Sequence, residues 1–292
     1  MQSPMEQTRS AKFEAQQKQK RKRTAILIVS ILLFILIAAS ALTIAQTVYG
    51  IPIFPTFGTE TDTDISDPNS LPVGAEFDKN LALILNQADQ IPEDLRKLYV
   101  RNTETFDFVI NYPNRKQYEQ NAALTQEEID SAYPFFLQWD KRWGYTEYCE
   151  GFFANTACGP TCLSMVIVGL THNSAATPRK IADYSEQHGY SIPGTGTAWA
   201  LMTAGAKSYG IQSKEISLSK SAMVQELQLG HPIICSMKPG DFTQAGHFIV
   251  IYAYEDGVFR VHDPNSIVRS EKTWDYDTLK GQISNLWSFS KK

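Results

Sequence analysis

Residues 24–45 form an apolar run without a charged side chain, and this run constrains the chain more than any other feature. As a helix, its 22 residues would span about 33 Å, enough to cross the hydrocarbon core of a bilayer. A core helix of that length normally carries a polar stripe, whereas the only polar residues here are Thr24, Ser30, Ser40 and Thr43. The sequence therefore predicts a transmembrane helix over residues 24–45.

Basic residues gather directly before the apolar run. Residues 1–23 hold seven Lys and Arg and two Glu, a net charge of +5, which leaves 20 basic and 29 acidic side chains, a net charge of −9, in the rest. Positive segments beside a membrane helix stay in the cytoplasm. We therefore expect residues 1–23 to be a cytoplasmic tail of a single-pass cell-membrane protein and residues 46–292 to be extracytoplasmic. Their acidic balance excludes a chain-wide nucleic-acid footprint.

The alternative to an anchor is a cleaved signal peptide. Small residues at Thr43 and Ala45 would allow cleavage before Gln46, which would release a secreted protein. The apolar run is longer than the roughly 7–15 residues of a usual signal-peptide core, which favours the anchor.

Composition divides the part after the run into three segments. Residues 46–75 contain Pro52, Pro55, Pro68 and Pro72 among Gly, Thr, Asp and Ser, which indicates an extended stalk. Residues 76–130 show apolar residues near helical spacing and predict a helical extension. About 50 residues without disulfides form a marginal core, so we expect this extension to pack against residues 131–292, which suffice for one domain.

Within residues 131–292 the predicted helices precede the predicted strands. Start and stop signals and apolar spacing place helices over 158–170, 177–188, 198–209 and 219–229, and strands over 232–237, 247–254, 258–263 and 286–290. A helical turn is expected near 276–283. This order predicts an α+β fold with a largely antiparallel sheet.

Cys158 stands at the predicted start of a helix, directly before Gly159 and Pro160. A thiol there lies close to the positive end of the helix dipole and to free backbone N–H groups, which stabilise the thiolate. The same N–H groups can donate to the oxyanion of a tetrahedral intermediate. Cys158 is therefore a candidate nucleophile, and a buried structural cysteine is the alternative.

His247 and Asp263 lie on a predicted β-hairpin whose turn contains Asp256 and Gly257. A two-residue Asp-Gly turn pairs residues across the hairpin whose numbers add up to 513, and it puts His247 on the same face of the sheet as His262. A three-residue loop pairs positions summing to 512 and puts Asp263 on the face of His247. We expect the three-residue loop, on functional grounds, because only that register lets Asp263 orient His247 as a general base and acid.

Several stretches together carry a family resemblance. They are residues 138–144 (QWDKRWG), 157–165 (ACGPTCLSM), 240–243 (GDFT) with 246–250 (GHFIV), and 262–265 (HDPN). They resemble the papain-like cysteine peptidases of family thirty-nine, the bacteriocin-processing peptidases of double-glycine leaders, in their stand-alone peptidase-like branch. Over about residues 131–292 the resemblance implies a papain-like fold, with Cys158 as nucleophile, His247 as base and Asp263 as orienting acid. It implies a cysteine peptidase acting on a peptide or protein substrate, which the predicted membrane topology places outside the cell.

The resemblance also implies an amide that donates to the oxyanion. Gln138, in the Gln-Trp-Asp motif 20 residues before Cys158, is our candidate, and Asn155 is the amide nearer the cysteine. The alternative for Gln138 is packing of the entry strand. Trp199 is a candidate substrate-binding residue because it follows a glycine-containing loop, although an aromatic residue early in a helix more often belongs to the core.

The remaining motifs predict no metal and no cofactor. Cys149, Cys158, Cys162 and Cys235 lack paired C-x2-C spacing, and a phosphate-binding loop is not found in the sequence. Cys162 and Cys235 are predicted core thiols. Cys149 lies in a loop, where exposure and a disulfide to Cys162 both stay open.

Two other functions also stay open at this point. One is a cell-wall amide hydrolase that uses the same three residues, and the other is a catalytically silent binding module on the same scaffold. The export role of transporter-fused family members does not carry over, because the sequence has a single hydrophobic span.

Overall fold

Residues 73–119, 122–194 and 196–292 are described by the structure, a computed structural model. Contacts group residues Asn69–Lys292 into one unit. The predicted tail (1–23), membrane helix (24–45) and nearly all of the stalk lie outside the described residues. In the described ranges no helix is both long and apolar enough to cross a bilayer.

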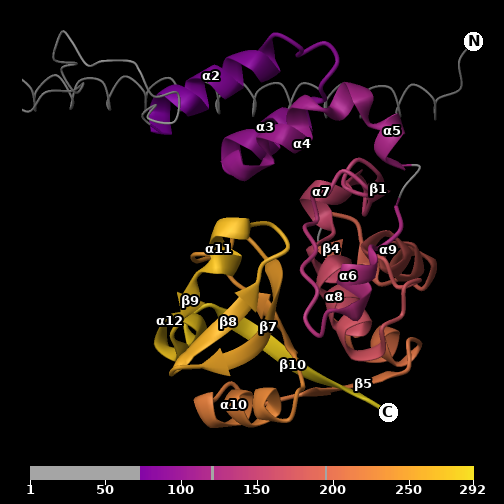
Figure 1. Cartoon of the computed structure of the whole chain (residues 1–292), viewed down its shortest axis with the longest axis vertical. Helices are drawn as coiled ribbons and strands as arrows, with labels where there is room; N and C mark the ends of the chain where they lie inside the picture. Colours follow the sequence, from indigo (N-terminus) through magenta and orange to yellow (C-terminus); the bar gives the residue numbers. More distant parts are fainter. Residues whose placement is uncertain (1–72, 120–121, 195) are drawn as a thin grey trace, which may run out of the picture. The chain divides into compact units, whose positions relative to one another are not determined.

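A six-stranded antiparallel sheet forms the C-terminal part, in the order β5-β10-β6-β7-β8-β9 (Figure 1). Its strands are β5 (Ile211–Glu215), β6 (Ile233–Met237), β7 (His247–Glu255), β8 (Val258–His262), β9 (Thr273–Trp274) and β10 (Ile283–Lys291). The antiparallel pairing confirms the α+β class. The sequence misses the two edge strands, because β5 is mostly polar and β9 has only two residues.

Helices and two short hairpins surround the sheet. The helices are α7 (Phe153–Thr156), α8 (Cys158–Thr171), α9 (Pro178–Gln187), the π-helix η3 (Leu201–Gly205), α10 (Lys220–Gln228), α11 (Ile267–Glu271) and α12 (Tyr276–Lys280). The hairpins are β1 (Glu147–Tyr148) with β2 (Gly151–Phe152), and β3 (Ser191–Ile192) with β4 (Gly196–Thr197). The helix predicted over 198–209 is thus irregular, since the Ala206 N–H donates five residues back to Leu201. The sequence does not predict α11.

Both faces of the sheet are buried. On one face Phe248 and Val250 of β7 pack with α8. Helix α8 is apolar on nearly all sides because it also packs against α9. On the other face Ile249 and Ile251 pack with residues of α10 and α12. The strand β7 is therefore covered on both faces. Its first residue, His247, lies next to the start of α8.

The segment before the sheet is helical, as the apolar spacing predicts. It contains α2 (Val73–Leu85), α3 (Glu93–Arg101), η1 (Thr103–Thr105), α4 (Phe106–Ile110), η2 (Tyr112–Asn114), α5 (Lys116–Glu119) and α6 (Gln126–Asp130). Helix α2 begins inside the predicted stalk, whose last three residues form its first turn. A third apolar cluster joins Leu95 and Phe108 of this segment to Trp139, Tyr145 and Ala154 of the part that follows.

The hairpin of β7 and β8 corrects the predicted turn. Glu255 pairs with Val258, so Asp256 and Gly257 form a two-residue turn with φ of 51° and 85°. The three-residue loop was therefore wrong. The register shifts between Ile251 and Ala253, however, after which Ile251 pairs with Val261. Because of this bulge, the residue numbers of each pair add up to 512 at the end of the hairpin that carries His247, which is the register the sequence analysis expected there.

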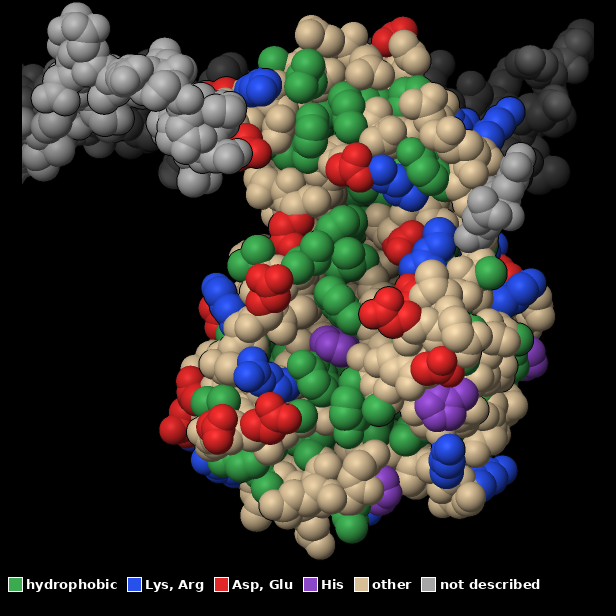
Figure 2. Space-filling model, viewed as in Figure 1, with side chains coloured by type: hydrophobic (Ala, Val, Ile, Leu, Met, Phe, Trp, Pro, Cys, Tyr) green, Lys and Arg blue, Asp and Glu red, His purple; other side chains and the backbone are tan. Residues whose placement is uncertain are grey.

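Charged side chains are distributed without large blocks of one sign on the face that Figure 2 shows. Acidic and basic groups alternate over the sheet, the helices and the N-terminal helical segment in that view. This pattern fits an ordinary solvated surface rather than a polyanion-binding face.

Candidate active site

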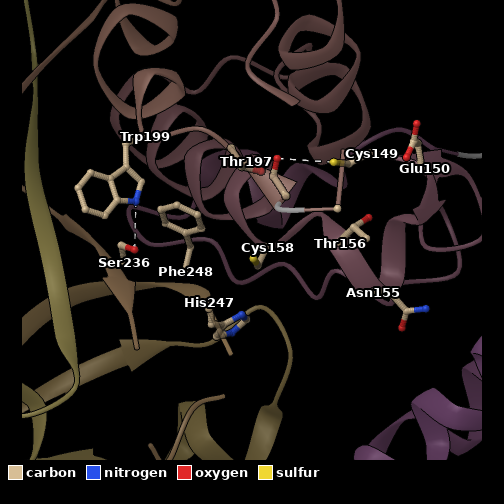
Figure 3. Close-up of a pocket in the computed structure, with 13 residues that line it drawn as sticks. Cys149, Glu150, Asn155, Thr156, Cys158, Thr197, Trp199, Ser236, His247 and Phe248 are labelled. Atoms are coloured by element: carbon tan, nitrogen blue, oxygen red, sulfur yellow. Dashed lines mark hydrogen bonds between the residues drawn. The ribbon is translucent and has the colours of Figure 1, made fainter. Parts of the chain in front are cut away.

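A cleft of about 560 Å³ lies between the start of α8 and the start of β7. Its lining includes Cys158, Thr197, Trp199, Ser236 and His247 (Figure 3). A volume of this order suits a short segment of peptide or a small organic ligand. Two of the three residues predicted to carry chemistry therefore face the same cleft.

Cys158 is the first residue of α8 and is half-buried. Its position leaves the first backbone N–H groups of the helix without partners in the helix itself, beside the sulfur. Cys162, one turn later, is fully buried, and burial raises the pKa of its thiol well above the ordinary value. Burial likewise raises the pKa of Cys235. Of these three thiols, only Cys158 lines the cleft.

His247 connects the cleft to a buried carboxylate. Its ring lies beside Cys158 in Figure 3, and its Nε2 is 2.7 Å from Asp263 Oδ1. Asp263 is fully buried and His247 is 7% exposed, so the pair is shielded from solvent. With Nε2 engaged by Asp263, the ring nitrogen Nδ1 is left for the side of Cys158. The structure thus brings Cys158, His247 and Asp263 together, although the predicted turn was wrong.

The charge state of His247 follows from these neighbours. Burial alone disfavours the imidazolium, but the charge of Asp263 and the hydrogen bond to it, with a smaller effect of Cys158, raise the pKa of His247 to about 10. Burial would raise the pKa of Asp263, but His247 and then Arg269 outweigh it and lower that pKa. The buried pair thus presents an imidazolium, rather than a neutral imidazole, to the sulfur of Cys158.

Arg269 is a residue of this site that sequence reasoning missed. Its Nε lies 2.5 Å from Asp263 Oδ2, on the side of the carboxylate away from His247. Asp263 Oδ1 also accepts a hydrogen bond from the Asn265 backbone N–H, at 2.8 Å. The only sequence signal for Arg269 was Ser266, a good N-cap residue, which accepts a hydrogen bond from the Arg269 N–H and starts α11.

The two candidate oxyanion amides lie in different places. Gln138 is buried, its Nε2 donates to the Ala154 carbonyl at 2.6 Å, and its Oε1 is buried without a partner. It is not among the residues that line the cleft. Asn155 does line the cleft, but its Oδ1 accepts a long hydrogen bond from Arg101 and its amide points away from Cys158 in Figure 3. The oxyanion role of Gln138 therefore stays a prediction.

Trp199 lies in the cleft wall, where the sequence analysis placed it. Its side chain is 48% exposed, its Nε1 donates to Ser236 Oγ at 3.2 Å, and its ring meets Trp287 edge-on. These contacts fix the indole while leaving one face open to the cleft, which is how an aromatic residue contacts a ligand.

Cys149 is buried rather than exposed, and all four cysteines are free. Cys149 and Glu150 form the two-residue turn between β1 and β2, both with positive φ, at the rim of the cleft. The Cys149 thiol donates to the Ile192 carbonyl at 3.0 Å. The disulfide to Cys162 that the sequence left open is thus not formed in this structure.

Comparisons with known proteins give a family and several structural neighbours, two of which are described first. The peptidase domain of Streptococcus ComA, a bifunctional ABC transporter of a quorum-sensing pathway, is 18% identical, with a TM-score of 0.40 over 55% of this chain and 99% of that domain. A C39-like peptidase from Bacillus anthracis is 13% identical, with a TM-score of 0.39 over 55% of this chain and 95% of that one. No curated protein matches the chain. The profile of the Peptidase_C39 like family matches residues 130–292, more than half of the sequence, and the chain therefore belongs to that family.

Proposed function

We propose that this protein is a membrane-anchored cysteine peptidase that hydrolyses peptide bonds on the extracytoplasmic side. The observation that carries the proposal is the position of His247, which lies beside Cys158 at the cleft and 2.7 Å from the buried Asp263. Family membership supports the same reaction class. In this proposal Cys158 is the nucleophile, His247 the general acid and base, and Asp263 the group that orients His247.

The reaction proceeds in two steps. The Cys158 thiolate attacks the scissile carbonyl, and the His247 imidazolium gives its proton to the leaving amine as the C–N bond breaks. Water then gives a proton to His247 and attacks the thioester, which releases the carboxylic acid and restores the Cys158 thiolate and the His247 imidazolium. Backbone N–H groups at the start of α8 stabilise the oxyanion in both steps, and Gln138 is the proposed side-chain donor.

Membrane anchoring completes the proposal. The apolar residues 24–45 hold the protein in the membrane, the basic residues 1–23 stay inside, and the stalk carries the peptidase outside. Epitope tags at both ends of the chain test this in intact cells, since external protease should remove only the C-terminal tag. Loss of the N-terminal tag from the mature protein would instead indicate cleavage near Ala45 and secretion.

Active-site labelling tests the catalytic part. The full chain in detergent, under reducing conditions, should react with a peptidyl vinyl sulfone at Cys158, located by mass spectrometry. Cys158→Ala and His247→Ala should abolish labelling, whereas Cys162→Ala should retain it, because burial keeps that thiol inert. An unlabelled wild-type protein that is folded would overturn the proposal and favour a binding module.

The kind of amide bond is tested separately. The wild-type chain should cut members of a peptide library, and Cys158→Ser should abolish turnover without unfolding the protein. Release of fragments from purified peptidoglycan, with no cleavage of the library, would replace peptidase by cell-wall amide hydrolase while leaving the three residues in their roles.

A further inference from the structure

We propose that Glu104, in the helical segment before the family-matched region, is a positioning residue for the catalytic histidine through Arg269 and Asp263. This inference rests on the proposed function. Its starting observation is a hydrogen-bonded chain between two parts of the sequence about 160 residues apart. Residues 130–292 match the family, so Glu104 lies outside that region.

The carboxylate of Glu104 caps helix α11. Its Oε1 accepts from Ser266 Oγ at 2.5 Å, and its Oε2 accepts from the backbone N–H groups of Ile267 at 2.6 Å and Val268 at 3.2 Å. All three donors belong to the first turn of α11 or its N-cap. A helix of five residues has little stability of its own, so a cap from outside has a large share in holding it.

Helix α11 in turn holds the carboxylate that orients His247. Ser266 Oγ accepts from the Arg269 N–H at 3.0 Å, and Arg269 Nε meets Asp263 Oδ2 at 2.5 Å. Because Arg269 occupies one oxygen of Asp263, the other oxygen is aimed at His247 Nε2. Ser266, which Glu104 fixes, is therefore three contacts away from the imidazole, through Arg269 and Asp263.

A neighbouring residue strengthens this connection. Asn102 caps η1 by accepting from the Glu104 N–H, and its Nδ2 donates to the Asn265 carbonyl at 2.6 Å. The same helical segment also packs against Trp139 and Ala154, on the side of the cleft that carries Cys158. The segment thus contacts both the part that bears the nucleophile and the loop that bears Asp263.

The titratable and charged groups around the pair are few. Asp263 and Cys158 act on His247, and His247 and Arg269 act on Asp263. If Glu104 no longer holds α11, Arg269 loosens and Asp263 is free to turn away. His247 then keeps the penalty of burial but loses its counter-charge, so its imidazolium form is disfavoured and Cys158 loses a neighbouring positive charge.

The test is the pH profile of Cys158 alkylation by iodoacetamide in the full chain, measured by mass spectrometry. Glu104→Gln, which keeps the shape and removes the charge, should shift the acidic limb toward higher pH by about one unit, or about tenfold in rate below the midpoint. Glu93→Gln, which removes an exposed Glu that pairs with Lys97, is the matched control and should leave the profile unchanged.

A double-mutant cycle separates positioning from simple stability. Arg269→Gln should shift the profile in the same direction, and Glu104→Gln combined with Arg269→Gln should add nothing further. Ser266→Ala, which breaks the same chain inside the family region, is a second variant should Glu104→Gln unfold. A lower melting temperature with an unchanged profile, or additive shifts, would overturn the inference. A wild-type Cys158 whose alkylation does not depend on His247 would instead overturn the proposed function.

Discussion

His247 and Asp263 are joined across the β7–β8 hairpin by a hydrogen bond of 2.7 Å, although the turn of that hairpin alone would put them on different faces. Near the turn the numbers of paired residues add up to 513. One extra residue in β7, between Ile251 and Ala253, changes this sum to 512 farther from the turn. A β-bulge of this kind redirects side chains next to active sites. The site therefore depends on a local irregularity as much as on the regular sheet.

The pair makes the stability of the protein depend on pH. The pKa of His247 rises from 6.5, the value of an unperturbed histidine in the unfolded chain, to about 10 in the folded protein. The folded state binds this proton more tightly, so the stabilisation is complete below pH 6.5 and is lost as pH rises toward 10. Relative to His247→Gln, wild type should lose up to about 1.4 kcal/mol of unfolding free energy per pH unit in that window. Urea unfolding at several pH values measures this, and a constant difference would contradict it.

Gly257 should be needed for the turn that precedes the bulge. Its φ of 85° and that of 51° at Asp256 match a two-residue hairpin turn with both central residues left-handed. Gly257→Ala should cost about 1–2 kcal/mol in urea unfolding. Gly281→Ala is the matched control, because its φ is −67° and an added Cβ meets nothing closer than 3.8 Å. Equal losses from both variants would refute this account of the turn.

Sequence reasoning found Cys158, His247 and Asp263 because each stands beside a strong local signal. Cys158 stands before Gly-Pro at a helix start, His247 begins an apolar strand, and Asp263 stands at the end of the next strand. The turn was wrong because two-residue and three-residue Asp-Gly loops share one signature. The bulge that compensates for this turn is set by packing on both faces of the sheet. No short motif encodes such packing.

Arg269 and Glu104 could not be found in the same way. Arg269 acts from a five-residue helix that is fixed by contacts from residues about 160 positions earlier. Such a helix has no periodic apolar pattern, and its cap comes from another segment. Contacts between distant segments are set by tertiary packing and leave no local mark in one sequence.

Gly159 is packed so closely that a methyl group should disturb the cleft. A Cβ at this position would lie 2.7 Å from Thr197 Cβ and Oγ1. Thr197 lines the same cleft as Cys158. Gly159→Ala should destabilise the protein by about 1–3 kcal/mol and slow the labelling of Cys158. Adding Thr197→Gly should recover part of the lost stability, and a merely additive loss would show that the clash is not the cause.

Trp199 should act on substrate binding with little effect on stability. Trp199 is 48% exposed, so Trp199→Ala removes little core packing but takes away the aromatic surface of the cleft. Once a substrate is in hand, KM should rise by about tenfold, equivalent to about 1.4 kcal/mol, while kcat changes less. Trp199→Phe should keep most of the affinity. A fall in kcat at unchanged KM would mean that Trp199 does not bind the substrate in this way.

Gln138 offers the sharpest separation between a chemical and a structural role. One N–H of its amide holds the Ala154 carbonyl, four residues before Cys158, and the proposal assigns the second N–H to the oxyanion. A buried Oε1 without a partner is unfavourable for stability alone and is more often tolerated where the group has a function. Gln138→Ala should lower kcat about 100-fold with little change in KM, whereas Asn155→Ala should not. If Gln138→Ala lowers only the melting temperature, the side chain merely anchors the loop before α8, and the backbone N–H groups of that helix must stabilise the oxyanion without it.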